Sequence, residues 1–198
     1  MCLSLLAETS KNRKGVTVKM AHLCVFCSAN QQIDADFFQM TEELGRWAAA
    51  AGHTIVFGGN DSGLMHAVSR AAKEAGGHLV GVVPRVIEQR GMLSPYLDVH
   101  IPTENLSDRK DLMMLQADVF IALPGGVGTL DEIFTMASSA SLGYHHKRIV
   151  LYNMKGFWDS LIAMMDDLQQ KGVIRGAWRD TIAVANSLDD IREFLAKC

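Results

Sequence analysis

Short apolar runs rich in β-branched residues recur along the chain, with amphipathic stretches between them. They predict strands at 21–27, 54–58, 79–84, 118–123 and 148–153, and a further one at 181–185. Because these runs are continuous rather than alternating, they are typical of strands whose two faces are both covered. Helical spacing relates Phe37, Met40, Leu44, Trp47, Ala48 and Ala51, then Phe157, Leu161, Met164, Met165 and Leu168, and finally Ile191, Phe194 and Leu195. This alternation predicts an α/β fold with a doubly wound parallel sheet and helices on both faces.

Length and charge narrow the class of protein. A chain of 198 residues buries roughly 70% of its unfolded surface, so one domain needs no metal or disulfide to hold it together. The net charge of −3 gives no general attraction to nucleic acid or acidic lipid. No apolar run has the length of a membrane span. We therefore expect a cytoplasmic protein without a nucleic-acid or membrane partner.

The first twenty residues differ from the rest. The apolar stretch "LSLLA" is too short for the core of a signal peptide, and no basic segment precedes it. The polar stretch "KNRKG" follows it. We expect residues 1–20 to form a flexible extension and residues 21–198 to form a single nucleotide-binding domain.

Four cysteines are present, at Cys2, Cys24, Cys27 and Cys198. "CVFC" has the spacing of a redox or zinc motif, but it lies inside a predicted strand. On a strand, residues i and i+3 point to opposite faces, so the two sulfur atoms should diverge. We interpret Cys24 and Cys27 as core residues and expect no metal site.

Two turns that follow predicted strands are rich in glycine: "VFGGNDSGLMH" and "ALPGGVGTLDE". Ligands of doubly wound sheets bind where such turns gather, at the carboxyl ends of the strands. Glycine lets backbone N–H groups come close to an oxyanion, and a following helix adds its N-terminal N–H groups. Neither turn has the spacing of a dinucleotide fingerprint or a P-loop. If the two strands are neighbours, both turns open on one phosphate site.

Glu132 has two interpretations. Thr129 and Glu132 have the spacing of a capping box, in which Thr129 would be the N-cap of a helix. Alternatively, Glu132 acts on whatever the glycines hold. Upstream, Arg109 and Lys110 in "LSDRKDLMM" are either a solvated helix face or ligands of a phosphate or base. These residues leave both questions open.

A family resemblance bears on these questions. Arg109 and Lys110, with Met113 three residues later, followed by "ADVFIALPGGVGTLDE", resemble the LOG ("lonely guy") family. Its members are cytokinin-activating nucleoside 5′-monophosphate phosphoribohydrolases, often labelled lysine decarboxylase-like. Their PGGxGTxxE motif is complete at residues 124–132. Similar stretches, in order, are "CVFC", "VFGGNDSGLM", "GVVPR", "SLGYHHKRIVLYN" and "GFWDSLI", so the likeness covers residues 21 to about 175.

The resemblance implies a Rossmann-like fold and a homodimer without metal or organic cofactor. It implies hydrolysis of the N-glycosidic bond of AMP or an N6-substituted AMP to free base and ribose 5-phosphate. The catalytic residues would be Arg109 and Glu132. The substrate- and phosphate-binding residues would be Gly58, Gly59, Ser62, Arg109, Lys110, Gly125, Gly126, Val127, Gly128, Thr129, Leu130 and Asp131.

The chain departs from the family pattern in its first glycine loop. Asn60 replaces a third glycine and His66 a later one, which bears on base preference more than on hydrolysis. A partly exposed helix histidine is the simpler interpretation of His66. "HHK" at 145–147 faintly resembles a pyridoxal-phosphate lysine motif, but Lys147 directly precedes a strand and one domain leaves little room for that cofactor. The alternative function is a non-catalytic carrier of a nucleotide or of molybdenum cofactor.

Overall fold

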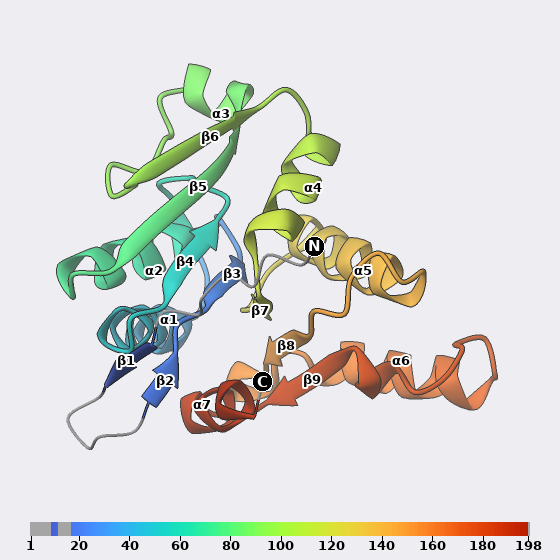
Figure 1. Cartoon of the computed structure of the whole chain (residues 1–198). Coiled ribbons are helices and arrows are strands. Elements are labelled where there is room, and N and C mark those ends of the chain that lie inside the picture. The colour runs from blue at the N-terminus through green and yellow to red at the C-terminus, as the bar shows by residue number, and fades with distance from the viewer. Residues whose placement is uncertain (1–8, 12–16, 198) are drawn as a thin grey trace, which may run out of the picture.

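Seven parallel strands form the central sheet of the computed structural model, which describes residues 9–11 and 17–197 (Figure 1). The strands are β3 (His22–Phe26), β4 (Thr54–Phe57), β5 (His78–Pro84), β6 (Val99–Thr103), β7 (Val119–Ala122), β8 (Ile149–Tyr152) and β9 (Ile182–Ala185). Their order is β6-β5-β4-β3-β7-β8-β9. The chain therefore winds from β3 toward one edge, returns to β7 and winds toward the other edge, as in a doubly wound Rossmann-like sheet.

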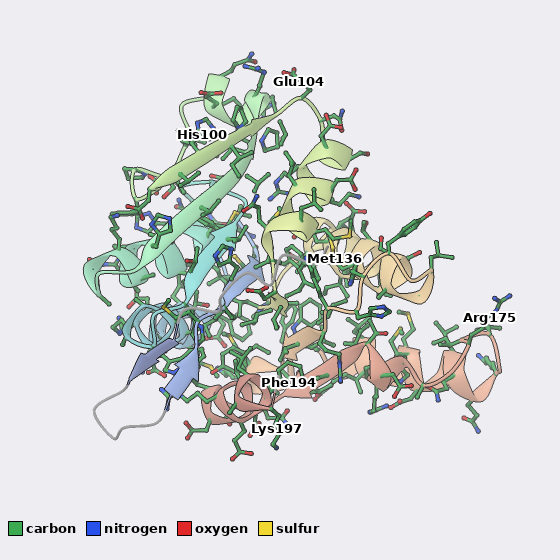
Figure 2. All side chains as sticks on the ribbon, viewed as in Figure 1. His100, Glu104, Met136, Arg175, Phe194 and Lys197 are labelled. Carbon is green, nitrogen blue, oxygen red and sulfur yellow. The ribbon has the colours of Figure 1, made fainter. Side chains whose placement is uncertain are left out.

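Helices cover both faces of this sheet. Residues of α1 (Ala35–Ala50), α2 (Gly63–Glu74) and α7 (Leu188–Ala196) contribute to the core on one face. Residues of α4 (Leu106–Gln116), α5 (Val127–Ser141) and α6 (Asp159–Gln170) contribute to the core on the other. The short helix α3 (Arg85–Gln89) follows β5, and two 3₁₀ turns, η1 (Met154–Gly156) and η2 (Trp178–Asp180), flank α6. Side chains such as Met136 of α5 fill the space between helix and sheet (Figure 2).

The predicted fold class and strands are confirmed, each strand to within one residue at either end. The prediction missed β6, the strand at one edge of the sheet. Its sequence "VHIPT" contains Pro102 and is only partly buried, so it lacks the continuous apolar run of the central strands. Ser187 is an N-cap, and it forms a capping box with Asp190 at the start of α7.

Strands β1 (Thr9–Lys11) and β2 (Thr17–Lys19) were not expected. They pair antiparallel in a small sheet of their own. The stretch "LSLLA" and most of "KNRKG" lie outside the described residues. The division into an extension and a single domain stays a prediction.

Cys24 and Cys27 are both buried, and they belong to the cores on opposite faces of the sheet. Burial raises the pKa of each thiol, so both remain protonated. Their interpretation as core residues is confirmed; Cys2 and Cys198 lie outside the described residues. No helix in the described part of the chain is long and apolar enough to cross a membrane.

Candidate functional site

Three loops meet at the carboxyl edge of the sheet. The two glycine-rich loops follow β4 and β7. These strands are not direct neighbours, the condition expected for one shared site, but lie on either side of β3. Ser28, just after β3, joins the loops: its N–H donates to the Pro124 carbonyl at 3.0 Å, and its carbonyl accepts from Leu64 N–H at 2.9 Å. The convergence of the loops therefore depends on the intervening strand.

Arg109 and Glu132 form the central ion pair of this region. Arg109 Nη1 donates to Glu132 Oε1 at 2.8 Å, and the side chains are only 11% and 7% exposed. Arg109 Nε also donates to the Val82 carbonyl at the end of β5, at 3.1 Å. The guanidinium thus has a fixed position between β5 and α5. Glu132 Oε2 accepts no hydrogen bond from the described residues, so it is available to water or substrate.

Gly58 makes room for the guanidinium. A Cβ built at this position would lie 2.1 Å from Arg109 Nη2 and 3.2 Å from the sulfur of Met65. Real Cβ atoms do not approach other atoms this closely, so any larger residue would displace the arginine. Gly59 has a φ of +68°, and its Cβ would lie 2.3 Å from a methyl of Val83. The observed position of Arg109 therefore requires Gly58, and the local backbone conformation and the contact with Val83 require Gly59.

The glycines of the second loop differ from one another. A Cβ at Gly125 would lie 2.1 Å from Thr129 Oγ1, so this glycine lets the loop fold back on α5. At Gly126 and Gly128 a Cβ would meet nothing within 4 Å, and neither residue has a positive φ. The packing of the chain gives no reason for these two glycines. Open space above N–H groups at the start of a 15-residue helix suits the close approach of an anion.

The predicted capping box at Thr129 is wrong. Helix α5 begins at Val127, its N-cap is Gly126, and no side chain caps it. Thr129 and Glu132 therefore lie inside the helix. Thr129 is buried with its side chain against Gly125, and the Glu132 carboxylate is turned to Arg109. Helix capping does not explain Glu132.

Burial raises the pKa of Glu132, and the Arg109 charge opposes this shift without cancelling it. Buried carboxylates with a raised pKa and a specific charged partner occur both in active sites and in structural ion pairs, so Glu132 is a candidate for acid–base chemistry.

The remaining predicted site residues occupy less central positions. Lys110 donates to both oxygens of Asp131, at 2.8 and 2.9 Å, and links α4 to α5 beside the central pair. The Ser62 hydroxyl donates to the Ala29 carbonyl at 2.8 Å, so its capacity to donate is already used. Val127 is 84% exposed next to the open glycines, whereas Leu130 packs into the core.

The departures from the family pattern have defined surroundings. Asn60 is buried in the first glycine loop, and its Oδ1 has no hydrogen-bond partner among the described residues. His66 is partly exposed, as expected, and its Nδ1 lies 2.7 Å from Asp61 Oδ1. Lys147 precedes β8, at the sheet edge opposite the glycine loops, and donates to the Met114 carbonyl at 2.6 Å. The "HHK" stretch therefore lies away from this site.

Sequence reasoning missed the Val82 carbonyl, which orients Arg109. A backbone acceptor has no side-chain signature, and only the sheet order brings the end of β5 next to α4 and α5. In the part of the chain that the structure describes, no cluster of three or more His, Cys, Asp or Glu side chains could hold a metal ion.

Comparison with known proteins finds relatives in sequence. The family model described as "Possible lysine decarboxylase" matches residues 65–195. A probable cytokinin riboside 5′-monophosphate phosphoribohydrolase of Oryza sativa subsp. japonica is 35% identical over 173 residues, which are 87% of this chain and 70% of the relative. The cytokinin riboside 5′-monophosphate phosphoribohydrolase of Mycobacterium tuberculosis is 34% identical over 176 residues, or 89% and 92% of the two chains.

Solved structures show the same fold. The molybdenum cofactor carrier protein of Chlamydomonas reinhardtii aligns with a TM-score of 0.68 at 23% identity, over 90% of this chain and 98% of that one. The molybdenum cofactor binding protein of Rippkaea orientalis aligns with a TM-score of 0.66 at 22% identity, over 90% and 97%. At this identity the likeness concerns the fold alone. The matches in sequence identify the chain as a member of the LOG family, whose model carries the lysine decarboxylase label.

Proposed function

We propose that this protein hydrolyses the N-glycosidic bond of a purine nucleoside 5′-monophosphate and releases the free base and ribose 5-phosphate. The observation that carries the proposal is the buried pair of Arg109 and Glu132, one helical turn from the open glycines of α5. Family membership supports the same chemistry, because the curated relatives are named phosphoribohydrolases.

The proposed binding mode follows from the spacing along α5. Gly128 and Glu132 are four residues apart, which is about 6 Å along a helix axis. A phosphate on the N–H groups of Gly126 and Gly128 would therefore place the ribose ring over the next turn. The anomeric carbon, at the far side of that ring, would then face Glu132.

In the proposed reaction, the C1′–N bond breaks with its electron pair going to the base, and ribose gains positive charge at C1′. The Glu132 carboxylate stabilises this charge and takes a proton from the attacking water, whose oxygen bonds to C1′. The departing base takes up a proton, so atoms and charge balance. General-base assistance of this kind typically contributes a factor of about 10² to 10⁴ in rate.

Arg109 would serve two purposes in this scheme. Its charge opposes the effect of burial and so favours the ionised form of Glu132. Its Nη2 lies against Gly58 at the opening between the loops, where it could bind the nucleotide or the departing base. A carrier needs the glycines but not a buried carboxylate, so this pair favours an enzyme over a carrier.

Product analysis tests the proposal. Purified protein is incubated with AMP, N6-isopentenyl-AMP, other nucleoside monophosphates and the matching nucleosides, and free base is separated by chromatography. We expect base from the monophosphates but not from the nucleosides, and little from the Glu132→Gln variant. Absence of base from every monophosphate, while AMP still raises the melting temperature, would favour the carrier function.

We also propose that the active form is a homodimer. Four large apolar side chains are exposed on and just after α5, at Val127, Phe134, Leu142 and Tyr144, and the first two share a helix face because they are seven residues apart. Exposed apolar patches of this kind mark association surfaces. A second copy would cover them next to the glycine loop.

A further inference from the structure

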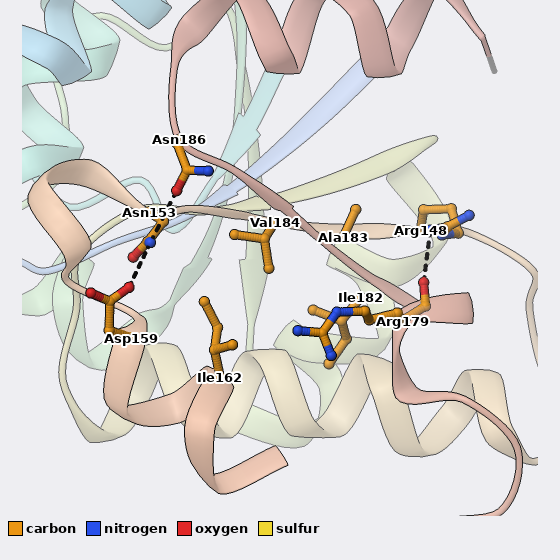
Figure 3. Close-up of a pocket in the computed structure, with 9 residues that line it drawn as sticks. All are labelled: Arg148, Asn153, Asp159, Ile162, Arg179, Ile182, Ala183, Val184 and Asn186. Carbon is orange, nitrogen blue, oxygen red and sulfur yellow. Dashed lines mark hydrogen bonds between the residues drawn. The ribbon is translucent and has the colours of Figure 1, made fainter. Parts of the chain in front are cut away.

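A cavity lies away from the glycine loops. It has a volume of about 490 Å³ and opens between α6 and the edge strand β9 (Figure 3). Its lining residues are Arg148, Asn153, Asp159, Ile162, Arg179, Ile182, Ala183, Val184 and Asn186. None of them belongs to the candidate site, so the proposed function gives no account of this cavity.

The edge strand beside the cavity has unused backbone groups. The Thr181 and Ala185 carbonyls accept hydrogen bonds from β8, from Ile149 N–H at 2.9 Å and Asn153 N–H at 2.7 Å. Because backbone groups alternate in direction along a strand, the N–H and C=O groups of Ile182 and Val184 point away from β8. As β9 is the last strand of the sheet, these groups face no further strand.

The two edges of the sheet are protected differently. At the far edge, β6 contains Pro102, which has no N–H to offer to another strand. The sequence of β9 is "IAVA", without proline, glycine or charge. An uncharged, regular edge strand is the usual template for the addition of an extended segment. The cavity provides the space beside it.

Charges of opposite sign lie at the two ends of the cavity. Arg148 and Arg179 lie at the amino end of β9, and Asp159 lies with Asn153 and Asn186 at its carboxyl end (Figure 3). Asp166 pairs with Arg179, but Arg148 has no anionic partner among the described residues, and its Nε has no hydrogen-bond partner there. The only hydrogen bond that Arg148 donates among the described residues goes to the Arg179 carbonyl, at 3.0 Å, and its guanidinium lies over the Phe194 ring, 5.5 Å from the ring centroid.

The acidic end of the cavity is weaker evidence for a bound ligand than Arg148 is. Asp159 accepts from Asn153 at 2.8 Å and has no cationic partner in the described part of the chain. It lies in the first turn of α6, where a carboxylate is favourable in any case. Arg148 and the open strand edge are therefore the main features that a ligand would recognise, and Asp159 would set the direction in which it lies.

We propose that this cavity binds a short free peptide in extended form, antiparallel to β9. Its C-terminal carboxylate would bind Arg148, its N-terminal ammonium would lie near Asp159, and its backbone would pair with Ile182 and Val184. The four residues of β9 span about 13 Å, the length of a peptide of three or four residues. Small apolar side chains would pack on Ile162 and Val184, which line the middle of the cavity.

Calorimetric titration of the whole protein with the tripeptide Ala-Leu-Ala tests this proposal. The same peptide is titrated with its C-terminus amidated and, separately, with its N-terminus acetylated. We expect saturable binding of the free peptide and at least tenfold weaker binding of the amide, because one charge-assisted contact is lost. The acetylated peptide should also bind more weakly. This comparison uses unmodified protein, so it does not depend on the folding of any variant.

Two substitutions locate the site. Arg148→Gln should weaken binding of the free peptide at least tenfold and remove its advantage over the amide. Arg175→Gln is the matched control, because Arg175 is exposed in the loop after α6, away from the cavity (Figure 2). It should bind within about twofold of wild type. No saturable binding up to about 10 mM, equal binding of amide and free peptide, or equal effects of the two substitutions would overturn the proposal. Equal affinity for the free and the N-acetylated peptide would overturn the assignment of Asp159 as the partner of the N-terminal ammonium.

Discussion

Two glycines of the second loop, Gly128 and Gly125, should respond in opposite ways to replacement by alanine: the first variant should keep or gain stability, and the second should lose it. A methyl group at Gly128 meets no atom within 4 Å, and this residue is the second of α5. Alanine is favoured over glycine in a helix by up to about 1 kcal/mol. For a domain of this size, that gain corresponds to a melting temperature higher by about 2–4 °C. Gly128→Ala should therefore be at least as stable as wild type.

Gly125→Ala should behave in the opposite way. Its Cβ would lie 2.1 Å from Thr129 Oγ1 and 2.5 Å from Thr129 Cβ, both far inside van der Waals contact. Overpacking of this kind costs about 1–3 kcal/mol, so the melting temperature should fall by several degrees. Differential scanning calorimetry of the two variants and wild type measures both effects.

Affinity separates ligand binding from folding. If Gly128 is a glycine so that phosphate can reach the backbone N–H groups, its methyl group should remove about one charge-assisted hydrogen bond, worth about 1.5–3 kcal/mol. The KM for AMP should then rise by a factor of about 10 to 100, although the protein is no less stable. A Gly128→Ala variant with the KM of wild type would refute the binding of phosphate at these N–H groups. A lower melting temperature of the same variant would show that the space around Gly128 is not open.

Four further predictions concern the same site and its surroundings. Because burial raises the pKa of Glu132, kcat/KM should fall on acidification with a midpoint above the ordinary range of a glutamate, and a midpoint within that range would contradict the assignment. Ionising this buried group costs stability as the pH rises through its raised pKa. The stability of Glu132→Gln relative to wild type, measured by thermal unfolding, should therefore increase from pH 4.5, the ordinary pKa of a glutamate, until the pH exceeds the raised pKa of Glu132. Gly58→Ala should displace Arg109 and lower kcat. It should also move the acidic limb of the pH–rate profile to higher pH, because Arg109 opposes the rise in the Glu132 pKa. A pH–rate profile identical to that of wild type would show that the guanidinium had not moved. Leu142→Asp should shift a dimer toward monomer in sedimentation velocity, since Leu142 is 70% exposed, and an unchanged mass would exclude this face from the interface.

The central strands were readable from the sequence because each is a continuous apolar run buried on both faces. The edge strand β6 was not, since Pro102 and partial exposure remove that signal. The two glycine loops could also be recognised in the sequence, but the way in which they face each other could not. The loops face each other only because β3 lies between β4 and β7, and Ser28 joins them.

The site shows a similar limit. The pairing of Arg109 with Glu132 joins residues 23 positions apart on different helices, which no local periodicity reports. The family resemblance indicated both residues, and the structure adds their contact. The capping rule failed at Thr129 because α5 begins two residues earlier, at Val127, and the Thr129 side chain packs against Gly125. The N-cap is Gly126, which has no side chain to cap the helix.

The number of free base molecules released per protein chain decides whether this protein is a hydrolase. Protein at a known concentration is mixed with a hundredfold excess of AMP, or of N6-isopentenyl-AMP, and free base is measured over time beside the Glu132→Gln variant. The account predicts many equivalents of base per chain from wild type, with ribose 5-phosphate in equal amount, and a rate at least about 100-fold lower in the variant. Release that stops at or below one equivalent for both nucleotides, or that is as fast in Glu132→Gln, would contradict it.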